Sequence, residues 1–211
     1  MKNILAILLC LSAIYGLTSC APKKSPFERH HFIIEANRDL GTASEQIPGT
    51  LTIRNFSVSP GYQGKEMVYR TKKNKAHADF YNHYFILPGP MISQVAREWF
   101  RDAGLFSSVV PPASNKEADF ILEGTINSIF GDFRNKVDPK AVLDMDFLLL
   151  KDTGLEFEVI FQKNYRAEHK MADRSAQELI NSFNKSLLEI LMSLENDMLV
   201  LYCPRNNSDS Y

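Results

Sequence analysis

Three consecutive stretches in the second half of the chain alternate hydrophobic and polar residues, as strands do when one face is buried. They are residues 118–130, 141–150 and 155–167, and the sequence Lys151-Asp152-Thr153-Gly154 favours a hairpin turn between the last two. In the third stretch we expect the aromatic and β-branched positions to point inward and the charged or amide positions outward; these are Phe157, Val159 and Phe161, against Glu156, Glu158 and Gln162. Short turns between alternating strands predict an antiparallel meander.

The first half of the chain predicts shorter strands, over residues 31–35, 50–58, 65–70 and 78–87. In the second of these, Leu51 and Ile53 lie on one face and Phe56 and Val58 on the other. That switch indicates either a bulge near Asn55 or burial on both faces. Residues 37–49 are polar and contain glycine, so they are predicted to be a loop.

Two stretches repeat apolar residues at helical spacing. The first follows Pro88-Gly89-Pro90 and ends at Gly104, a residue suited to the left-handed end of a helix. The second begins at residues 173–175, where Ser175 and Glu178 have capping-box spacing, and extends to residue 198. The largest residues expected in the core on these stripes are Trp99 and Phe183. The predicted fold is α+β: a mostly antiparallel sheet with two helices packed on one face.

Residues 1–19 have the organisation of a secretory signal peptide, with a short positive start, an apolar run over residues 4–15 and small residues before a cysteine. Leu17-Thr18-Ser19-Cys20 is similar to the lipobox of bacterial lipoproteins, which implies a lipid anchor on Cys20 after cleavage before it. The apolar run is too short for a membrane span, which needs about 20 residues. By analogy with enterobacterial sorting, Ala21 points to the outer membrane; the inner membrane and the cell surface stay open.

The rest of the chain divides into a lipidated tether (20–30), a single α+β domain (31–200) and a polar C-terminal tail (201–211). The whole chain has 24 Lys and Arg against 25 Asp and Glu, and the part from Cys20 onward has 23 against 25, so no strong field attracts nucleic acid. Beyond the signal peptide and Cys20, Cys203 is the one remaining cysteine, which excludes an intramolecular disulfide. Cys203 is interpreted as an incidental free thiol, with pairing between chains as the alternative.

The order of elements resembles the ABC-type transport auxiliary lipoprotein family, which serves MCE-type (mammalian cell entry) lipid transport and includes paraquat-inducible protein C. The resemblance rests on three stretches in order: residues 51–62 with their Pro-Gly-Tyr ending, the hydrophobic-Tyr-Arg strand 67–70, and residues 118–124, which begin the meander. An aromatic strand and a helix ending in Gly104-Leu105-Phe106 lie between them. The match covers most of residues 31–198.

This resemblance implies a non-enzymatic lipoprotein that docks an MCE-type periplasmic protein, with its ABC permease and ATPase, at the outer membrane. A homo-oligomer is left open. The alternative is an assembly or plug lipoprotein for an outer-membrane barrel, of the kind found in lipopolysaccharide translocons. Those proteins share a lipobox and a sheet with two helices. Neighbouring genes would distinguish the two interpretations.

Motifs for catalysis are missing from the sequence. No serine stands in G-x-S-x-G, no phosphate-binding loop or Walker motif is present, and the five histidines have neither HExxH nor zinc-site spacing. No cofactor is therefore expected. Asp144 with Asp146, and Glu156 with Glu158, form acidic pairs on adjacent strands. Acid–base chemistry is one interpretation, but the solvent-exposed face of a sheet explains the alternation fully.

Tyr62 and Arg70 are the candidates for a partner interface, because Tyr and Arg are enriched in interface hot spots. Within the strand 67–70, Met67 and Tyr69 share one face, and Val68 and Arg70 the other. The alternative is one aromatic residue packed in the core and one surface arginine.

Overall fold

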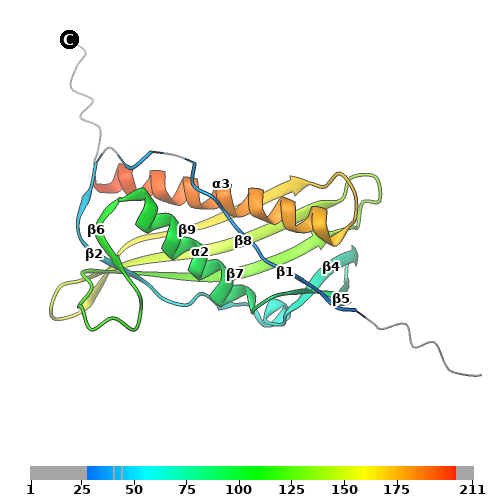
Figure 1. Cartoon of the computed structure of the whole chain (residues 1–211), viewed down its shortest axis with the longest axis horizontal. Coiled ribbons are helices and arrows are strands. Elements are labelled where there is room, and N and C mark those ends of the chain that lie inside the picture. The colour runs from blue at the N-terminus through cyan, green and yellow to red at the C-terminus, as the bar shows by residue number, and fades with distance from the viewer. Residues whose placement is uncertain (1–27, 40, 44, 203–211) are drawn as a thin grey trace, which may run out of the picture.

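The computed structural model describes residues 28–39, 41–43 and 45–202, which form a sheet and two long helices (Figure 1). The signal peptide, the lipidation site Cys20 and the end of the tail with Cys203 lie outside the described residues. In chain order the elements are β1 (His30–Phe32), β2 (Ile47–Ile53), β3 (Ser57–Val58), the 3₁₀ helix η1 (Pro60–Tyr62), β4 (Glu66–Lys72), β5 (Lys75–Tyr84), α2 (Pro88–Ala103), β6 (Phe106–Val110), β7 (Phe120–Asp132), β8 (Lys140–Asp152), β9 (Phe157–Lys170) and α3 (Ala176–Tyr202).

The sheet is organised around β7. Along one edge, β7 pairs antiparallel with β8 over its whole length. Along the other edge, three short strands pair with it in succession, all parallel: β2 beside residues 120–122, β3 beside residues 125–126 and β4 beside residues 131–132. β6 extends the sheet beyond β2, and β5 and β1 extend it beyond β4. The segment from residue 51 to residue 70 therefore lies along one edge of β7 and departs from that edge mainly around η1.

The sheet is mixed. Its longest pairings, β7–β8 and β8–β9, are antiparallel and confirm the predicted meander, and β4–β5 is a further antiparallel hairpin. The short pairings of β1 with β5 and of β2 with β6 are parallel. β6 was not among the expected strands. It lies parallel to β2 because α2 carries the chain back across the sheet, as a parallel connection requires.

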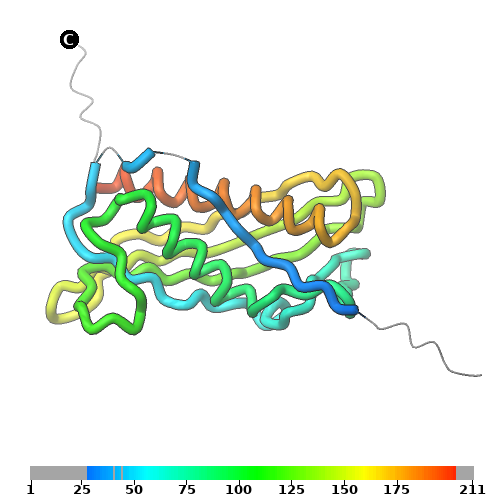
Figure 2. Tube along the Cα trace, viewed as in Figure 1, coloured from blue at the N-terminus to red at the C-terminus, as the bar shows by residue number. Residues whose placement is uncertain are grey.

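Both helices cover the same face of the sheet, as predicted (Figures 1 and 2). We call this side the covered face and the opposite side the open face. On β8, Leu143, Met145 and Phe147 are buried on the covered face, whereas Asp144 and Asp146 alternate with them on the open face. The predicted core residues of the two helices, Trp99 and Phe183, are also buried. Apolar burial on one face therefore fixes the α+β architecture.

The helix ends follow the predicted local signals. Gly104 adopts a left-handed conformation (φ 62°), and its N–H donates to the carbonyl of Arg101 at 3.2 Å. At the start of α3, the N–H of Glu178 donates to the Ser175 hydroxyl at 3.1 Å. The Glu178 carboxylate does not close the capping box on Ser175 and accepts instead from the N–H of Ala172 at 3.2 Å. α3 then continues beyond the predicted end at residue 198 to Tyr202.

The irregularity expected near Asn55 is a break between β2 and β3. Phe56 is buried there, and its ring packs edge-on against Phe147 at a centroid distance of 5.6 Å. The ring passes so close to Gly124 of β7 that a Cβ at that position would lie 2.6 Å from it. Glycine at position 124 therefore lets the β2–β3 segment stay against β7.

One part of the meander differs from the sequence pattern. Phe157 and Val159 are 50% and 54% exposed, whereas Phe161 packs against the core as predicted. The register between β8 and β9 shifts at Ile160, which has no partner on β8. One extra residue reverses the alternation along the strand, so Phe157 and Val159, before Ile160, point to the face opposite to that of Phe161. The predicted inward placement of Phe157 and Val159 is therefore wrong.

Candidate functional site

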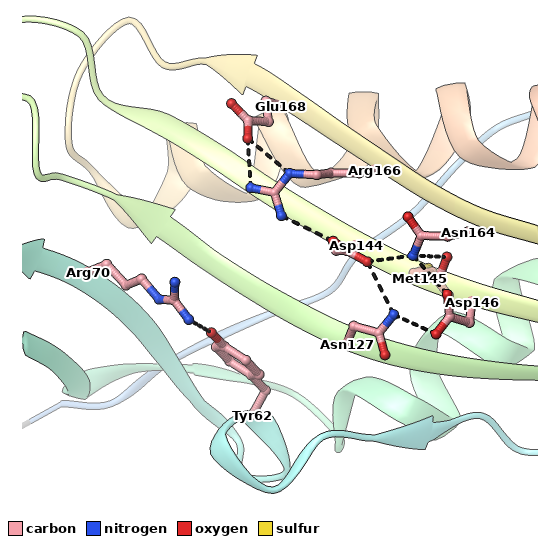
Figure 3. A network of polar contacts seen from close by, with 9 residues as sticks. All are labelled: Tyr62, Arg70, Asn127, Asp144, Met145, Asp146, Asn164, Arg166 and Glu168. Carbon is pink, nitrogen blue, oxygen red and sulfur yellow. Dashed lines mark hydrogen bonds and ion pairs between the residues drawn. The ribbon is translucent and has the colours of Figure 1, made fainter. Parts of the chain in front are cut away.

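The open face carries a polar ladder across β7, β8 and β9 (Figure 3), made of Asn127, Asp144, Asp146, Asn164, Arg166 and Glu168. Asp144 accepts hydrogen bonds from Asn127 at 3.2 Å, Asn164 at 2.8 Å and Arg166 at 3.1 Å. Asp146 accepts from the same two amides, both at 2.8 Å. Residues from three strands meet here because Asp146, Asn164 and their neighbours stand opposite one another in the register.

The ladder favours the charged form of two of its carboxylates, Asp144 and Glu168. Partial burial favours the neutral form of Asp144, but hydrogen bonds from Asn164, Asn127 and Arg166 outweigh it and lower the pKa of that carboxyl. Arg166 also donates to Glu168 at 2.7 Å, and this hydrogen bond lowers the pKa of Glu168 and raises that of the guanidinium. General acid–base catalysis needs a pKa near the working pH. The pKa values of Asp144 and Glu168 are instead lowered, further from neutral pH, so these carboxyls stay charged and paired.

The two predicted acidic pairs have different outcomes. Asp144 and Asp146 lie on the open face and are engaged in the ladder, whereas Glu156 precedes β9 and Glu158 stands opposite Lys151. In the part of the chain that the structure describes, no three His, Cys, Asp or Glu side chains gather closely enough to hold a metal ion. The acidic residues of the open face thus build a hydrogen-bonded surface.

The structure brings the two predicted interface residues together. Tyr62 of η1 stacks on Phe130 of β7 at a centroid distance of 6.1 Å. The guanidinium of Arg70 lies 4.3 Å from the centroid of the same ring and donates to the Tyr62 hydroxyl at 2.8 Å. Both residues are half-buried on the open face (Figure 3). The cation–π contact and the hydrogen bond preorganise a rigid aromatic and cationic pair, with an edge left to water.

Tyr69 follows the alternative interpretation of an aromatic residue packed in the fold. It stacks on Phe133 at 5.0 Å, and its hydroxyl donates to Asp79 at 2.8 Å. Burial and the hydrogen bond to Asp79 raise the pKa of the Tyr69 hydroxyl above its usual value. Tyr69 and Arg70 therefore point to opposite faces, as the alternation in residues 67–70 predicted.

A shallow depression of about 220 Å³ lies beside the ladder, lined in part by Glu123, Asp146 and Gln162. Arg54 forms an ion pair with Glu123 at its rim. Pockets for small molecules are typically 300–1,000 Å³ and mostly apolar. The depression beside the ladder is smaller than such a pocket.

Sequence reasoning missed a buried polar cluster that joins the two helices to Arg38. Glu195 of α3 accepts hydrogen bonds from the Trp99 indole N–H at 2.7 Å and from Arg38 at 2.7 and 3.1 Å. The side chains of Arg38 and Glu195 are only 4% and 8% exposed. The bond to Glu195 raises the pKa of Arg38 above its already high value, because it favours the cation. The cluster fastens the predicted loop 37–49 to both helices. Its sequence signal is a single carboxylate within an apolar helical stripe.

The histidines do not form a common site. His31 is part of β1, and its ring lies 6.1 Å from that of His83. His169 lies 2.9 Å from the carboxylate of Glu189 on α3.

Within residues 28–202 as described, no helix combines the length and the hydrophobicity needed to cross a membrane.

Comparison with known proteins shows the fold. No protein-family model and no curated protein matches the sequence. Among solved structures, protein XCC0632 from Xanthomonas campestris, described by the family model DUF330, superposes with a TM-score of 0.68 at 12% identity, covering 81% of this chain and 93% of that one. A protein described only as uncharacterized gives 0.62 at 11% identity, with 81% and 99% covered. The hypothetical protein CT253 from Chlamydia trachomatis gives 0.50 at 11% identity, with 74% and 99% covered.

Proposed function

We propose that this chain is a lipid-anchored protein of the bacterial envelope that binds a partner and catalyses no reaction itself. Its partner would be the periplasmic assembly of an ABC/MCE-type lipid transport system, which it docks at the outer membrane. The observation that carries the proposal is the open face, where charged side chains are occupied by one another and Tyr62 and Arg70 form a preorganised pair. The lipobox at Cys20 and the resemblance to auxiliary lipoproteins supply the location and the partner class.

The mechanism is positional. A diacylated or triacylated Cys20 stays in the bilayer, since each buried methylene contributes about 0.8 kcal/mol. The short tether keeps the folded domain close to the membrane surface. The open face then binds the end of a periplasmic assembly, and lipids pass along that assembly without chemistry on this chain.

The absence of catalysis is part of the proposal and rests on the chemistry of the open face. A hydrolase needs a nucleophile, a base within hydrogen-bond reach and donors for an oxyanion. Asp144 and Glu168 of the polar ladder have lowered pKa values and are hydrogen-bonded to amide and guanidinium groups. They therefore make poor general bases near neutral pH.

Capture of the partner tests the proposed function. The full-chain lipoprotein carrying Tyr62→Ala and Arg70→Ala should retain less than a tenth of the wild-type capture of an MCE-type protein from detergent-solubilised envelope. A control pair, Gln94→Ala with Arg101→Ala on the exposed side of α2, should capture it normally. Because Tyr62 and Arg70 also pack on Phe130, both variants are compared at a temperature at which circular dichroism shows them folded.

Two results would contradict the proposal. Normal capture by the folded Tyr62/Arg70 variant would place the interface elsewhere. If the wild-type protein captures no MCE-type protein but co-purifies with an outer-membrane barrel, the alternative of an assembly or plug lipoprotein replaces this one.

A further inference from the structure

β5 contains a wide bulge that projects two aromatic side chains. Val68 of β4 pairs with Ala78, and Glu66 pairs with His83, so a single residue of β4 stands opposite residues 79–82 of β5. Asp79 holds the bulge in shape. Its carboxylate accepts from the backbone N–H groups of Tyr81 and Asn82, at 2.8 and 3.0 Å, and from the side chains of Asn82 and Tyr69, both at 2.8 Å. These hydrogen bonds to Asp79 therefore fix the conformation of the bulge.

The aromatic residues of the bulge contribute little to the core. Phe80 and Tyr81 are 58% and 45% exposed, and their rings pack edge-to-face at a centroid distance of 5.2 Å. Phe85, at the end of β5, is 58% exposed. Exposed large apolar side chains that gather in one place mark a contact surface.

β1 brings these residues into one patch. The guanidinium of Arg29 lies 5.2 Å from the Phe80 ring, and the His31 ring lies 6.4 Å from that of Phe85. Arg29, His31 and Ile33 alternate along the chain, so their side chains point to one side of β1. We define the amino-terminal patch as the exposed residues Ile33, Phe80, Tyr81, Phe85, Ile86 and Leu87.

The amino-terminal patch lies at the end of the described chain that is nearest in sequence to Cys20, which indicates what it contacts. The described chain begins at Glu28, directly before β1, and Figure 1 shows that this point and the β4–β5 hairpin lie at one end of the long axis. Cys20 precedes Glu28 by a segment that, even fully extended, spans no more than about 28 Å. A lipid on Cys20 therefore keeps this end of the molecule beside the bilayer. The β8–β9 turn and the end of α3 lie at the opposite end.

The charge around the patch fits a lipid surface. Lys65 donates to the carbonyl of Phe85 at 2.9 Å, and the β4–β5 hairpin ends in Lys72, Lys73 and Lys75. Glu28, Glu66 and Asp79 are the acidic residues of segments 28–33 and 65–87, and the Asp79 carboxylate accepts hydrogen bonds within the bulge. Aromatic side chains favour the interface between headgroups and acyl chains, and nearby lysines attract anionic headgroups.

We propose that the amino-terminal patch inserts into the surface of the membrane in which Cys20 is anchored, with Phe80 and Tyr81 entering the boundary between headgroups and acyl chains. This inference rests on the proposed lipid anchor. It adds an orientation: with two contacts on one bilayer, the opposite end of the domain is directed away from the membrane.

Fluorescence quenching tests the contact. The full-chain lipoprotein is reconstituted into vesicles of phosphatidylethanolamine and phosphatidylglycerol (3:1) whose acyl chains are brominated. Phe80→Trp introduces an indole in the patch, and Phe157→Trp introduces one at the opposite end, where the wild-type ring is 50% exposed. Trp99, the single native tryptophan, is buried and serves as a constant background. We expect the brominated lipid to quench at least half of the added emission of Phe80→Trp and less than a tenth of that of Phe157→Trp.

The outcomes separate this inference from the anchor. If the wild-type protein does not float with the vesicles, the anchor itself is wrong. If it floats and the Phe80→Trp emission is unquenched, or if both positions are quenched equally, the patch does not orient the domain on the bilayer. Should Phe80→Trp disturb folding, Tyr81→Trp replaces it, with the same expected quenching and the same contradiction.

Discussion

The covered and open faces of the same sheet differ in how their charged side chains are surrounded. On the covered face, apolar side chains pack against the two helices, and the one carboxylate buried there among the described residues, Glu195, is bound by Trp99 and Arg38. On the open face, Asp144 and Arg166 have several partners and also water. Water can replace a lost partner on the open face and cannot on the covered face. Substitutions on the covered face should therefore cost more stability than substitutions on the open face.

The largest loss of stability should follow from truncating a large buried side chain on the covered face. We expect Trp99→Ala and Phe183→Ala each to lower the free energy of unfolding by about 3–5 kcal/mol, because both side chains are fully buried and leave a cavity. Urea denaturation followed by circular dichroism measures the change. Met192→Ala, on an exposed position of α3, is the control and should cost under about 1 kcal/mol. A midpoint that barely moves for Trp99→Ala would mean that α2 packs on a partner and not on the sheet.

Removing the buried carboxylate should cost nearly as much. Glu195→Ala takes away the group that binds both Trp99 and Arg38, and breaking a buried ion pair from one side costs about 3–5 kcal/mol. Glu189→Ala is a matched control on the same helix, since the Glu189 side chain is 57% exposed and pairs with His169 at the surface. Equal losses for the two variants would contradict the difference between buried and exposed carboxylates.

A methyl group at Gly124 should have an intermediate effect. The added Cβ would approach the Phe56 ring to 2.6 Å, and overpacking of this kind costs about 1–3 kcal/mol. Gly41→Ala is the control, because its Cβ would meet nothing within 4 Å. Combining Gly124→Ala with Phe56→Leu should cost less than the sum of the single changes, since both act on one contact. Simple additivity in thermal denaturation would contradict the proposed clash.

The smallest effect belongs to the open face and depends on pH. The pKa values of Asp144 and Glu168 are lowered in the folded state, so their stabilisation is present above the unfolded-state pKa near 4 and is lost as pH falls through the lower folded-state values. Arg166→Ala should cost about 0–1 kcal/mol at pH 7 and less still at pH 3. Stability measured between pH 7 and pH 3 tests this. A larger loss at pH 3 than at pH 7 would have the wrong sign.

Local signals predicted local structure well. Gly104 ends α2 and Ser175 begins α3 because such caps depend on a few neighbouring residues. Alternation also identified β7 and β8 and their buried faces. It failed for Phe157 and Val159, which precede Ile160, because a bulge changes the phase without a mark in the residues around it. The parallel pairings of β2, β3 and β4 with β7 were not predicted, since they join segments far apart in the sequence.

The candidate site was predicted in parts. Tyr62 and Arg70 were chosen separately from residue type, but their meeting over Phe130 requires η1, β4 and β7 to come together. Glu195 was not predicted, although it is a carboxylate beside an apolar helical stripe. Its partner Arg38 lies in a loop whose position no periodicity predicts. Pairs made by tertiary structure were therefore the part that sequence patterns could not supply.

The two edges of β7 have a consequence for the order of folding. Its pairing with β8 joins neighbouring strands through a short turn, whereas its opposite edge receives Thr50 across 69 residues of chain, through the bond to Asp119. Closing long loops slows folding more than closing short ones. The β7–β9 meander can therefore form early as a template, and β2, β3 and β4 add later, one after another along its exposed edge. Until they do, that edge can pair with another chain, so aggregation is most expected during this interval.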